Sequence, residues 1–410
     1  MGVFELTHIH ALKCRECGRE YPLSREYVCE ECFGPLDVVY EYDSIELDPR
    51  AFQGRPRTIW RYSELLPILN SSNIVDIGAG YTILRRADRL AKSLGLREVY
   101  IKDDSVNPTY SFKDRPAAVA VSKALELGYK AVGCPSTGNL AAATAAHAAK
   151  AGLPCYVFIP ADIELNKVLQ AATYGANLIA VKGTYDDANR LAVQASEAYD
   201  WALVNINIRP YYVEGSKTLA FEVCEQLGWT PPDHVIVPMA SGALLSAIGK
   251  GFDEFAKVGL IEKQSVRITG VQPAGCSPIV QAFRSNRDRI TPIQYPNTVA
   301  KSLAIGDPAD GRYAARRIRE SGGTAESVTD TETLAALKLL AKTEGVFTEP
   351  AGAVTIAALK KLSETGKIPA DEKVVCYVTG NGLKTPEALS GHVPKPIEIE
   401  PKLELVRGIL

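Results

Sequence analysis

One lysine of this chain stands where its amine could act as a nucleophile. Lys113 lies in the run SFKDR at 111–115, which follows a turn-rich stretch at 107–110 and a strand-like stretch at 99–102. The residues after Lys113 predict a helix that begins at this lysine. A helix N-terminus carries a positive partial charge, which disfavours an ammonium ion and favours the neutral amine that a Schiff base with an aldehyde cofactor requires. Taken alone, this run is more typical of a solvated lysine in a first helical turn.

A second loop offers polar groups at a predicted helix start. The loop STGNL follows a short apolar run and precedes an alanine-rich helix that we expect over 141–150. Gly138 lets a ligand approach the backbone closely, and Ser136 and Asn139 supply polar side chains. Both side chains are also ordinary helix N-caps, so the loop alone does not indicate a binding site.

A third loop could bind phosphate through its backbone. The β-branched stretch 235–237 predicts a strand, which runs into the small residues of 238–243 and then into an apolar helix. Small residues at a helix start expose backbone N–H groups, which suits a phosphate. The same pattern also occurs in plain packing turns between a strand and a helix.

The order of these motifs resembles the fold-type-II pyridoxal-phosphate enzymes, the group that includes the tryptophan synthase β chain. The order is SFKDR, STGN, PMASGALL and, near the end of the chain, TGNG at 379–382. Three further segments, at 270–278, 300–311 and 349–352, resemble threonine synthase. The likeness covers about 55–389 and implies an α/β fold with two open parallel-sheet domains.

The alternation of strand-like and helical runs agrees with this fold class. Strand-like runs such as 156–159 and 374–378 alternate with helical runs such as 185–199 and 331–344. This alternation predicts parallel sheets with helices on both faces. We expect the C-terminal tail to pack as an extended strand. The expected parts are a small zinc-ribbon-like segment at 1–45, a discontinuous large domain at 46–101 and 208–392, a small α/β domain at 102–207 and the tail at 393–410.

The resemblance implies pyridoxal 5′-phosphate as the cofactor and assigns residues to it. Lys113 corresponds to the lysine that forms the Schiff base, and Asn139 to the asparagine that hydrogen-bonds the ring hydroxyl oxygen. Thr379 corresponds to the hydroxyl residue beside the pyridine nitrogen, where it stabilises a protonated ring less than a carboxylate would. Phe112 would lie close to the ring, or equally belong to the core. The phosphate cradle corresponds to Ala240, Ser241, Gly242, Ala243 and Leu244.

The implied reaction converts O-phospho-L-homoserine and water to L-threonine and phosphate. Phosphate leaves from the γ-carbon, water adds at the β-carbon, and Lys113 moves the protons. A leaving phosphate requires an anion pocket, for which Arg312 is less suitable because it reads more simply as a surface charge. The residues we expect to bind the substrate are Ser111, Ser136, Thr137, Asn207, Arg209 and Lys301.

Two departures from the common family pattern affect this pocket. Tyr110 stands where glycine is frequent, and Tyr212 stands where many relatives carry an arginine that could bind phosphate, a loss for which Arg209 could compensate. A cysteate synthase that uses O-phospho-L-serine and sulfite, and a serine or threonine dehydratase, therefore remain alternatives with the same cofactor residues. A zinc-ribbon interaction protein with a degenerate enzyme body is a third alternative, against which Lys113 argues.

Four of the nine cysteines have the spacing of a metal site. Cys14 and Cys17 form one CxxC pair, and Cys29 and Cys32 form a second pair after eleven intervening residues. Two such pairs suit tetrahedral thiolate coordination of a structural Zn²⁺. Two disulfides or four free thiols are the alternatives, and disulfides are disfavoured in a cytoplasmic chain. The small strands of this ribbon are expected at Tyr21 and 38–40.

The composition is that of a water-soluble enzyme. The chain has 410 residues, of which 46% are hydrophobic and 23% charged, and its formal net charge is −2. This balance gives no reason to expect nucleic acid or an anionic membrane as a partner, and no apolar run reaches the roughly 18 residues of a membrane span. The first residues do not resemble a signal peptide, so we expect a cytoplasmic location. The fold type further implies a homodimer acting on a small-molecule substrate.

Overall fold

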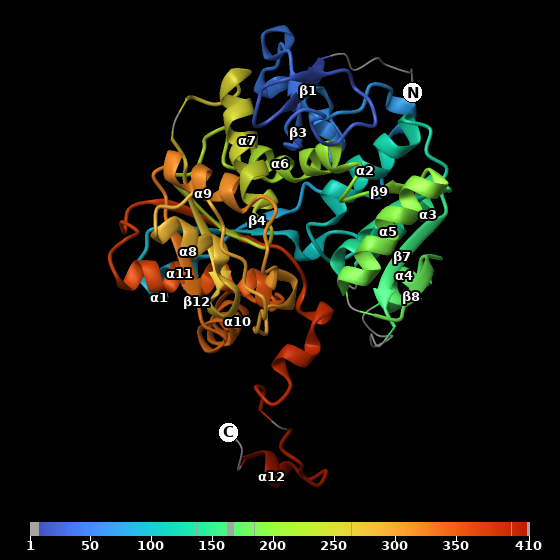
Figure 1. Cartoon of the computed structure of the whole chain (residues 1–410). Coiled ribbons are helices and arrows are strands. Elements are labelled where there is room, and N and C mark those ends of the chain that lie inside the picture. The colour runs from blue at the N-terminus through green and yellow to red at the C-terminus, as the bar shows by residue number, and fades with distance from the viewer. Residues whose placement is uncertain are drawn as a thin grey trace.

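The computed structural model describes residues 8–136, 138–161, 168–183, 185–263, 265–394 and 396–407. Within these ranges the chain forms three sheets, of three, six and four strands, with helices packed around the two larger ones (Figure 1). The expected α/β class with open parallel sheets and a small N-terminal ribbon is confirmed. None of the helices in these ranges combines the length and apolar character that a bilayer crossing needs.

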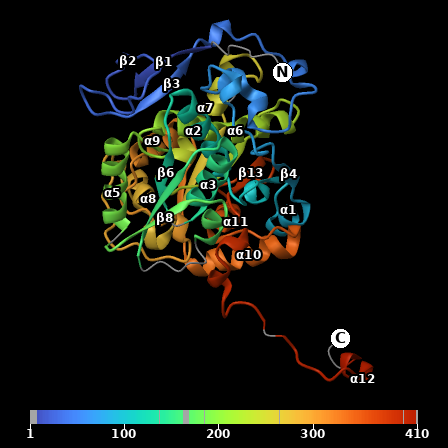
Figure 2. The ribbon, with the colours of Figure 1, turned by 90° about the vertical axis from the view of Figure 1, so that its right-hand side faces the viewer.

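The N-terminal ribbon is a three-stranded antiparallel sheet. Its central strand β1 (Ile9–Cys14) pairs with β2 (Glu20–Tyr21) on one side and with β3 (Leu36–Tyr40) on the other, as expected. The ribbon lies against α6 (Arg209–Gln226) and α7 (Ala243–Lys257), as both views of the chain show (Figures 1 and 2).

A buried ionic cluster fixes the ribbon on these two helices. The Tyr40 hydroxyl donates to Glu214 at 2.8 Å, and Lys250 Nζ donates to the carbonyl of Val38 at 2.7 Å. Lys217 and Lys250 both lie 2.6 Å from the Glu214 carboxylate. Since buried charges are tolerated only when they are paired, these contacts hold the ribbon in one orientation on α6 and α7.

Three of the predicted cofactor segments follow strands of the six-stranded sheet. The run at 111–115 comes after β5 (Glu98–Asp103), the loop at 240–244 after β10 (His234–Pro238) and the run at 379–382 after β13 (Lys373–Val378). Successive side chains of a strand point to opposite faces, and Val235 and Val237 accordingly join one core cluster while Ile236 joins another. All neighbouring strands of this sheet are parallel except β4 (Ile83–Arg86) and β5 (Glu98–Asp103), which are antiparallel. The strand order is β12 (Ala325–Val328), β11 (Arg267–Pro273), β10 (His234–Pro238), β13 (Lys373–Val378), β5 (Glu98–Asp103) and β4 (Ile83–Arg86).

Helices cover both faces of this sheet, as parallel strands require. The helix α10 (Asp330–Glu344) begins with a capping box, in which Thr329 and Glu332 satisfy each other's backbone N–H groups. One face packs against α6, α7, α8 (Pro278–Arg284) and α9 (Gly311–Glu320), and α2 (Asp114–Glu126) packs against α6. The other face packs against α1 (Asp88–Leu94), α10 (Asp330–Glu344) and α11 (Pro350–Glu364).

The four-stranded parallel sheet lies within residues 132–203. The alanine-rich helix α3 (Asn139–Ala151) has high helix propensity and ends at Gly152, which takes a left-handed φ of 68°. The strand order is β8 (Asn177–Val181), β7 (Cys155–Pro160), β6 (Val132–Pro135) and β9 (Ala202–Leu203), and the other helices are α4 (Leu169–Thr173) and α5 (Tyr185–Tyr199).

The expectation of an extended strand in the C-terminal tail is wrong. The described part of the tail pairs with no sheet edge and instead forms the short helix α12 (Leu403–Arg407), which extends away from the body of the protein (Figures 1 and 2). Prolines interrupt this segment, and a proline has no backbone N–H to donate to a strand ladder.

Candidate active site

The loop before Lys113 pairs with the loop after β13. Ser111 forms an antiparallel bridge with Gly380, and the N–H of Phe112 donates to the carbonyl of Thr379 at 2.9 Å. Ser111 is fully buried and Thr379 is 3% exposed, so this pairing lies in the interior. Lys113 therefore sits beside Thr379 at the carboxyl end of β13, where open α/β sheets bind their ligands.

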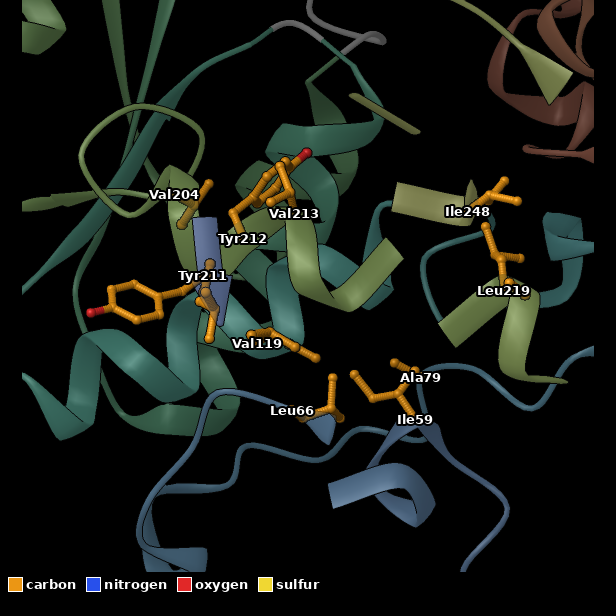
Figure 3. Packing of buried hydrophobic residues seen from close by; sticks show 14 of the residues in the cluster. Ile59, Leu66, Ala79, Val119, Val204, Tyr211, Tyr212, Val213, Leu219 and Ile248 are labelled. Carbon is orange, nitrogen blue, oxygen red and sulfur yellow. The ribbon is translucent and has the colours of Figure 1, made fainter. Parts of the chain in front are cut away.

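The amine of Lys113 contacts two aromatic side chains. Its Nζ donates to the hydroxyl of Tyr212 at 3.0 Å and lies 4.7 Å from the centre of the Phe112 ring. Tyr212 belongs to the first turn of α6, where it lies beside Val213 (Figure 3). From sequence alone, Tyr212 is only a position where many relatives carry an arginine. Its contact with Lys113 was not predicted, because it joins residues 99 positions apart. No local pattern signals such a contact.

Asn139 reaches a carboxyl group that the sequence analysis did not single out. Its Nδ2 donates to Oε1 of Glu349 at 3.0 Å, and Glu349 is 3% exposed at the start of α11. Burial raises the pKa of Glu349 to about 7, against the opposing effects of Lys384, Asn139 and Lys113. A carboxyl group that titrates near neutrality at this place is suited to exchange a proton.

Replacing Glu349 by glutamine tests this pKa through stability. In the unfolded chain the carboxyl ionises near its usual pKa of 4.5, whereas the folded protein keeps the proton until about pH 7. Because the native state binds more protons between these values, wild-type stability falls as the pH rises from about 4.5 to 7, by on the order of 3 kcal/mol from this group. The Glu349→Gln variant should lack this loss.

Urea unfolding at pH 5 and pH 8 measures the effect. The free energy of unfolding of Glu349→Gln relative to wild type should be higher at pH 8 than at pH 5. Glu364→Gln is the matched control, because Glu364 is an exposed carboxylate at the other end of α11. A Glu349→Gln difference that is the same at both pH values would contradict the raised pKa.

The small-residue loop at the start of α7 has the features of a phosphate cradle. Gly242 has a φ of 95°, and a Cβ at this position would lie 2.8 Å from the carbonyl oxygen of Asp310. Both the backbone conformation and the space therefore require glycine. Within the described residues, the backbone amides of Ser241, Gly242, Ala243 and Leu244 donate to no carbonyl oxygen. Apart from a 3.4 Å hydrogen bond of the Ala243 N–H to the hydroxyl oxygen of Ser241, these donors at a helix N-terminus are free in the described residues, and they form the kind of site that binds phosphate.

Asp310 supports this loop and binds one of the predicted substrate residues. Its N–H donates to the carbonyl of Ser241 at 3.0 Å. Its side chain, 2% exposed, accepts hydrogen bonds from Arg209 and, at 3.2 Å, from Arg15 of the ribbon. Arg209, which the sequence analysis assigned to the substrate phosphate, thus lies beside the cradle and is paired with Asp310.

The other predicted substrate residues lie at different depths. Ser111 is buried beside Lys113, as described above, and Ser136 is half-buried and accepts the N–H of Gly138 at 3.3 Å. The half-buried side chain of Asn207 bonds the backbone at β9, at 2.7 and 3.0 Å. Lys301 is exposed, and Thr137 lies outside the described residues.

The backbone conformation of Tyr110 gives the physical reason why glycine is frequent at this position in the family. Its φ of 66° lies in the left-handed region, which a glycine adopts without strain and a tyrosine does not. Two backbone hydrogen bonds hold this conformation, from its N–H to Asn107 at 2.8 Å and from Asn381 to its carbonyl at 3.0 Å. The side chain is 50% exposed and lies three residues before Lys113.

The four N-terminal cysteines converge on one point. Their sulfur atoms all lie within 4.8 Å of one another, with 3.4 Å between Cys14 and Cys32 and 3.6 Å between Cys17 and Cys29. Tetrahedral coordination with metal–sulfur bonds of about 2.3 Å places sulfur atoms roughly 3.8 Å apart, so the cluster fits a structural metal ion. The hydroxyl of Tyr21 donates to the sulfur of Cys29 at 3.1 Å and helps to orient it.

Comparisons with known proteins show the family to which the chain belongs. Residues 75–380 match the family model described as pyridoxal-phosphate dependent enzyme. The threonine synthase of Methanocaldococcus jannaschii is 43% identical over 401 residues, which cover 97% of this chain and 98% of the relative. This chain belongs to the threonine synthase family. The threonine synthase of Methanosarcina acetivorans is also 43% identical, over 403 residues that cover 97% of this chain and 98% of the relative.

A solved structure confirms the fold of this threonine synthase family member. Diaminopropionate ammonia lyase from Escherichia coli superposes with a TM-score of 0.65 and 20% identity, covering 84% of this chain and 95% of the other. At this identity the likeness concerns the fold alone.

The described residues fit pyridoxal phosphate, the cofactor of the family. Thr379 is 3% exposed, and no hydrogen bond of its hydroxyl is found within the described ranges, which leaves this hydroxyl available to a ring nitrogen. The backbone amides at the start of α7, which donate to no carbonyl oxygen in the described residues, suit the phosphate group. In the described part of the chain, the amine of Lys113 is held by one hydrogen bond, to Tyr212.

Proposed function

We propose that this protein is a threonine synthase, a pyridoxal-phosphate dependent lyase that converts O-phospho-L-homoserine and water to L-threonine and phosphate. Two threonine synthases that match almost the whole chain at 43% identity support this reaction. The structural observation that carries it is the placement of Lys113, Thr379 and the 240–244 loop at one edge of the six-stranded sheet. This edge is formed by the carboxyl ends of the adjacent parallel strands β10 and β13.

The cofactor would be held by residues of this edge together with Asn139 at the start of α3. Lys113 would hold its aldehyde end, Asn139 its ring hydroxyl and Thr379 its pyridine nitrogen, while the amides of 240–244 would bind its phosphate. Pyridoxal phosphate, when bound, supplies an electron sink for the charge that develops at the α-carbon of the substrate. The ring of Phe112, against Nζ of Lys113, would keep the amine in one orientation.

The protein side chains must then move and hold the protons. Nζ of Lys113 takes the proton from the α-carbon of the substrate and then from the β-carbon. Tyr212 keeps the amine in place through its 3.0 Å hydrogen bond. Phosphate leaves from the γ-carbon, which later gains a proton, while water gives its hydroxyl to the β-carbon and a proton returns to the α-carbon. Glu349, which titrates near pH 7, is suited to hold one of these protons.

Phosphate release is the direct test of this function. Purified protein given O-phospho-L-homoserine should release equimolar inorganic phosphate and L-threonine. A parallel sample given O-phospho-L-serine and sulfite distinguishes a cysteate synthase, and L-serine or L-threonine alone distinguishes a dehydratase. Product from either alternative, without threonine from the first sample, would overturn the proposal.

The four cysteines are proposed to bind a structural Zn²⁺. Protein purified under reducing conditions should then carry about one zinc ion per chain, because four thiolates complete a closed tetrahedral site. The Cys29→Ser variant should lose most of this metal, since Cys29 is the buried ligand to which Tyr21 donates. Elemental analysis by mass spectrometry measures the metal content. Cys276→Ser is the control, and equal zinc content in both variants would rule out the assignment.

The remaining expectations concern the organisation of the enzyme. We propose a homodimer in the cytoplasm, where the thiols of the ribbon stay reduced. We also propose that 102–207 forms a separate small domain, because the four-stranded sheet lies inside this range and most of the six-stranded sheet lies outside it. The cofactor would lie between this domain and the large domain at 46–101 and 208–392.

A further inference from the structure

The N-terminal ribbon touches the proposed phosphate cradle through one arginine. Arg15 stands between the two cysteines of the first CxxC pair, and its Nη1 lies 3.2 Å from Oδ1 of Asp310. Asp310 in turn contacts the cradle with its backbone, because its N–H donates to the carbonyl of Ser241 and its carbonyl oxygen packs against Gly242. A continuous series of contacts therefore joins the CxxC turn at 14–17 to the 240–244 loop.

Two consecutive residues of the CxxC turn at 14–17, Arg15 and Glu16, contact the start of α9. The guanidinium of Arg15 is held in a fork by Asp37 of β3, with both N–O distances at 2.6 Å, so its direction toward α9 is fixed. The neighbouring Glu16 pairs with Arg312 and accepts from the hydroxyl of Tyr313, both in the first turn of α9. Arg312 is thus a contact of the ribbon, which gives it a role other than phosphate binding.

Arg15 helps to neutralise the buried carboxylate of Asp310. The carboxylate of Asp310 is 2% exposed and is shared by Arg15 and Arg209, which approach from the ribbon and from the start of α6. A buried carboxylate that loses one of two cationic partners is poorly compensated and must shift toward the other or toward water. Because Asp310 is bonded to the loop through its own backbone, such a shift would displace the carbonyl of Ser241.

We propose that Arg15 is a positioning residue for the phosphate group of the cofactor, acting through Asp310 on the 240–244 loop. The proposal rests on the cofactor placement given above. Backbone donors bind phosphate well only within a narrow range of distance and angle, so a small displacement of the loop weakens binding at the phosphate. The ribbon is then part of the support of the active site, although it lies far from Lys113 in the sequence.

The test compares two ligands that differ only in the phosphate. Cofactor-free protein is titrated with pyridoxal phosphate and, separately, with pyridoxal, and the dissociation constants are measured by absorbance. Arg15→Ala should weaken the binding of pyridoxal phosphate roughly ten-fold and leave the binding of pyridoxal unchanged. Arg19→Ala is the matched control, because Arg19 lies on the same ribbon and pairs with Glu31, both about half exposed.

A second variant keeps the test decisive if Arg15→Ala loosens the ribbon. Asp310→Asn preserves the shape of the side chain but removes its charge, and it should weaken pyridoxal phosphate selectively as well. If Arg15 acts through Asp310, adding Arg15→Ala to Asp310→Asn should cost little further affinity.

Three results would overturn the proposal, and one would concern the cofactor instead. Unchanged binding in Arg15→Ala, equal weakening of both ligands, or fully additive losses in the double variant would show that Arg15 does not position the phosphate loop. Wild-type protein that binds pyridoxal phosphate no more tightly than pyridoxal would instead refute the cofactor placement, so the two failures are distinguishable.

Discussion

Lys113→Ala should abolish threonine formation, with a loss in kcat of at least roughly 10³-fold. The variant removes the amine beside Phe112 and Tyr212 that we propose both to hold the cofactor aldehyde and to move the substrate protons. Because these roles are specific to the amine, the folded structure should survive. The visible absorbance of the bound cofactor should change, while the thermal unfolding midpoint stays close to that of wild type.

The control for this variant is Lys130→Ala, which removes an exposed lysine shortly after the end of α2. It should keep full activity and the wild-type spectrum. Retained threonine formation in Lys113→Ala would refute the role assigned to Lys113 in the reaction. Loss of activity together with a large fall in the unfolding midpoint would show that Lys113 acts in the fold rather than in the chemistry.

The position of Lys113 follows from local sequence. A strand-like run, a turn and a helix start occur within 99–114, and short-range patterns of this kind determine where a helix begins. The strand before the phosphate loop is signalled in the same way by the β-branched residues of 235–237. The site at the carboxyl edge of the large sheet could be predicted for this reason, since each contributing segment carries its own local signal.

The partners of these residues could not be predicted in this way. Tyr212 and Glu349 are 99 and 210 positions from Lys113 and Asn139, so their contacts depend on how whole helices pack on the sheet. Glu349 carried one usable signal, an acid directly before the proline that begins a helix. Asp310 carried none, because its contacts with Ser241, Arg209 and Arg15 join parts of the chain that are far apart in the sequence.

The arginine that follows Lys113 by two positions has a different part, which sequence alone does not reveal. Arg115 is fully buried, and its guanidinium lies 2.6 Å from Asp104 and 2.8 Å from Glu222. Lys102, also fully buried, lies 2.6 Å from the same Glu222 carboxylate. Two cations and two carboxylates thus balance one another beneath α2, and the cluster links this helix to α6 and β5.

Replacing Arg115 by methionine should destabilise the protein by about 3–5 kcal/mol at pH 7, because it leaves two buried carboxylates with only Lys102. Urea unfolding monitored by circular dichroism measures the loss. Arg86→Met is the matched control, since Arg86 is an exposed arginine paired with Asp88, and its effect should stay below about 1 kcal/mol. A loss for Arg115→Met as small as that of the control would mean that the cluster contributes little to stability.

The pH dependence separates this electrostatic effect from simple loss of packing. Burial alone would raise the pKa of Glu222, but the charges of Arg115 and Lys102 outweigh it and lower the pKa to about 2. The ionised carboxylate therefore stabilises the wild-type fold fully above its unfolded pKa of 4.5, and this contribution disappears as the pH falls toward 2. The penalty of Arg115→Met should accordingly shrink as the pH is lowered through this range, because the unpaired carboxyls take up protons. A stability penalty that is independent of pH would point to lost packing of the arginine side chain. In that case Glu222→Gln in the Arg115→Met background should restore no stability.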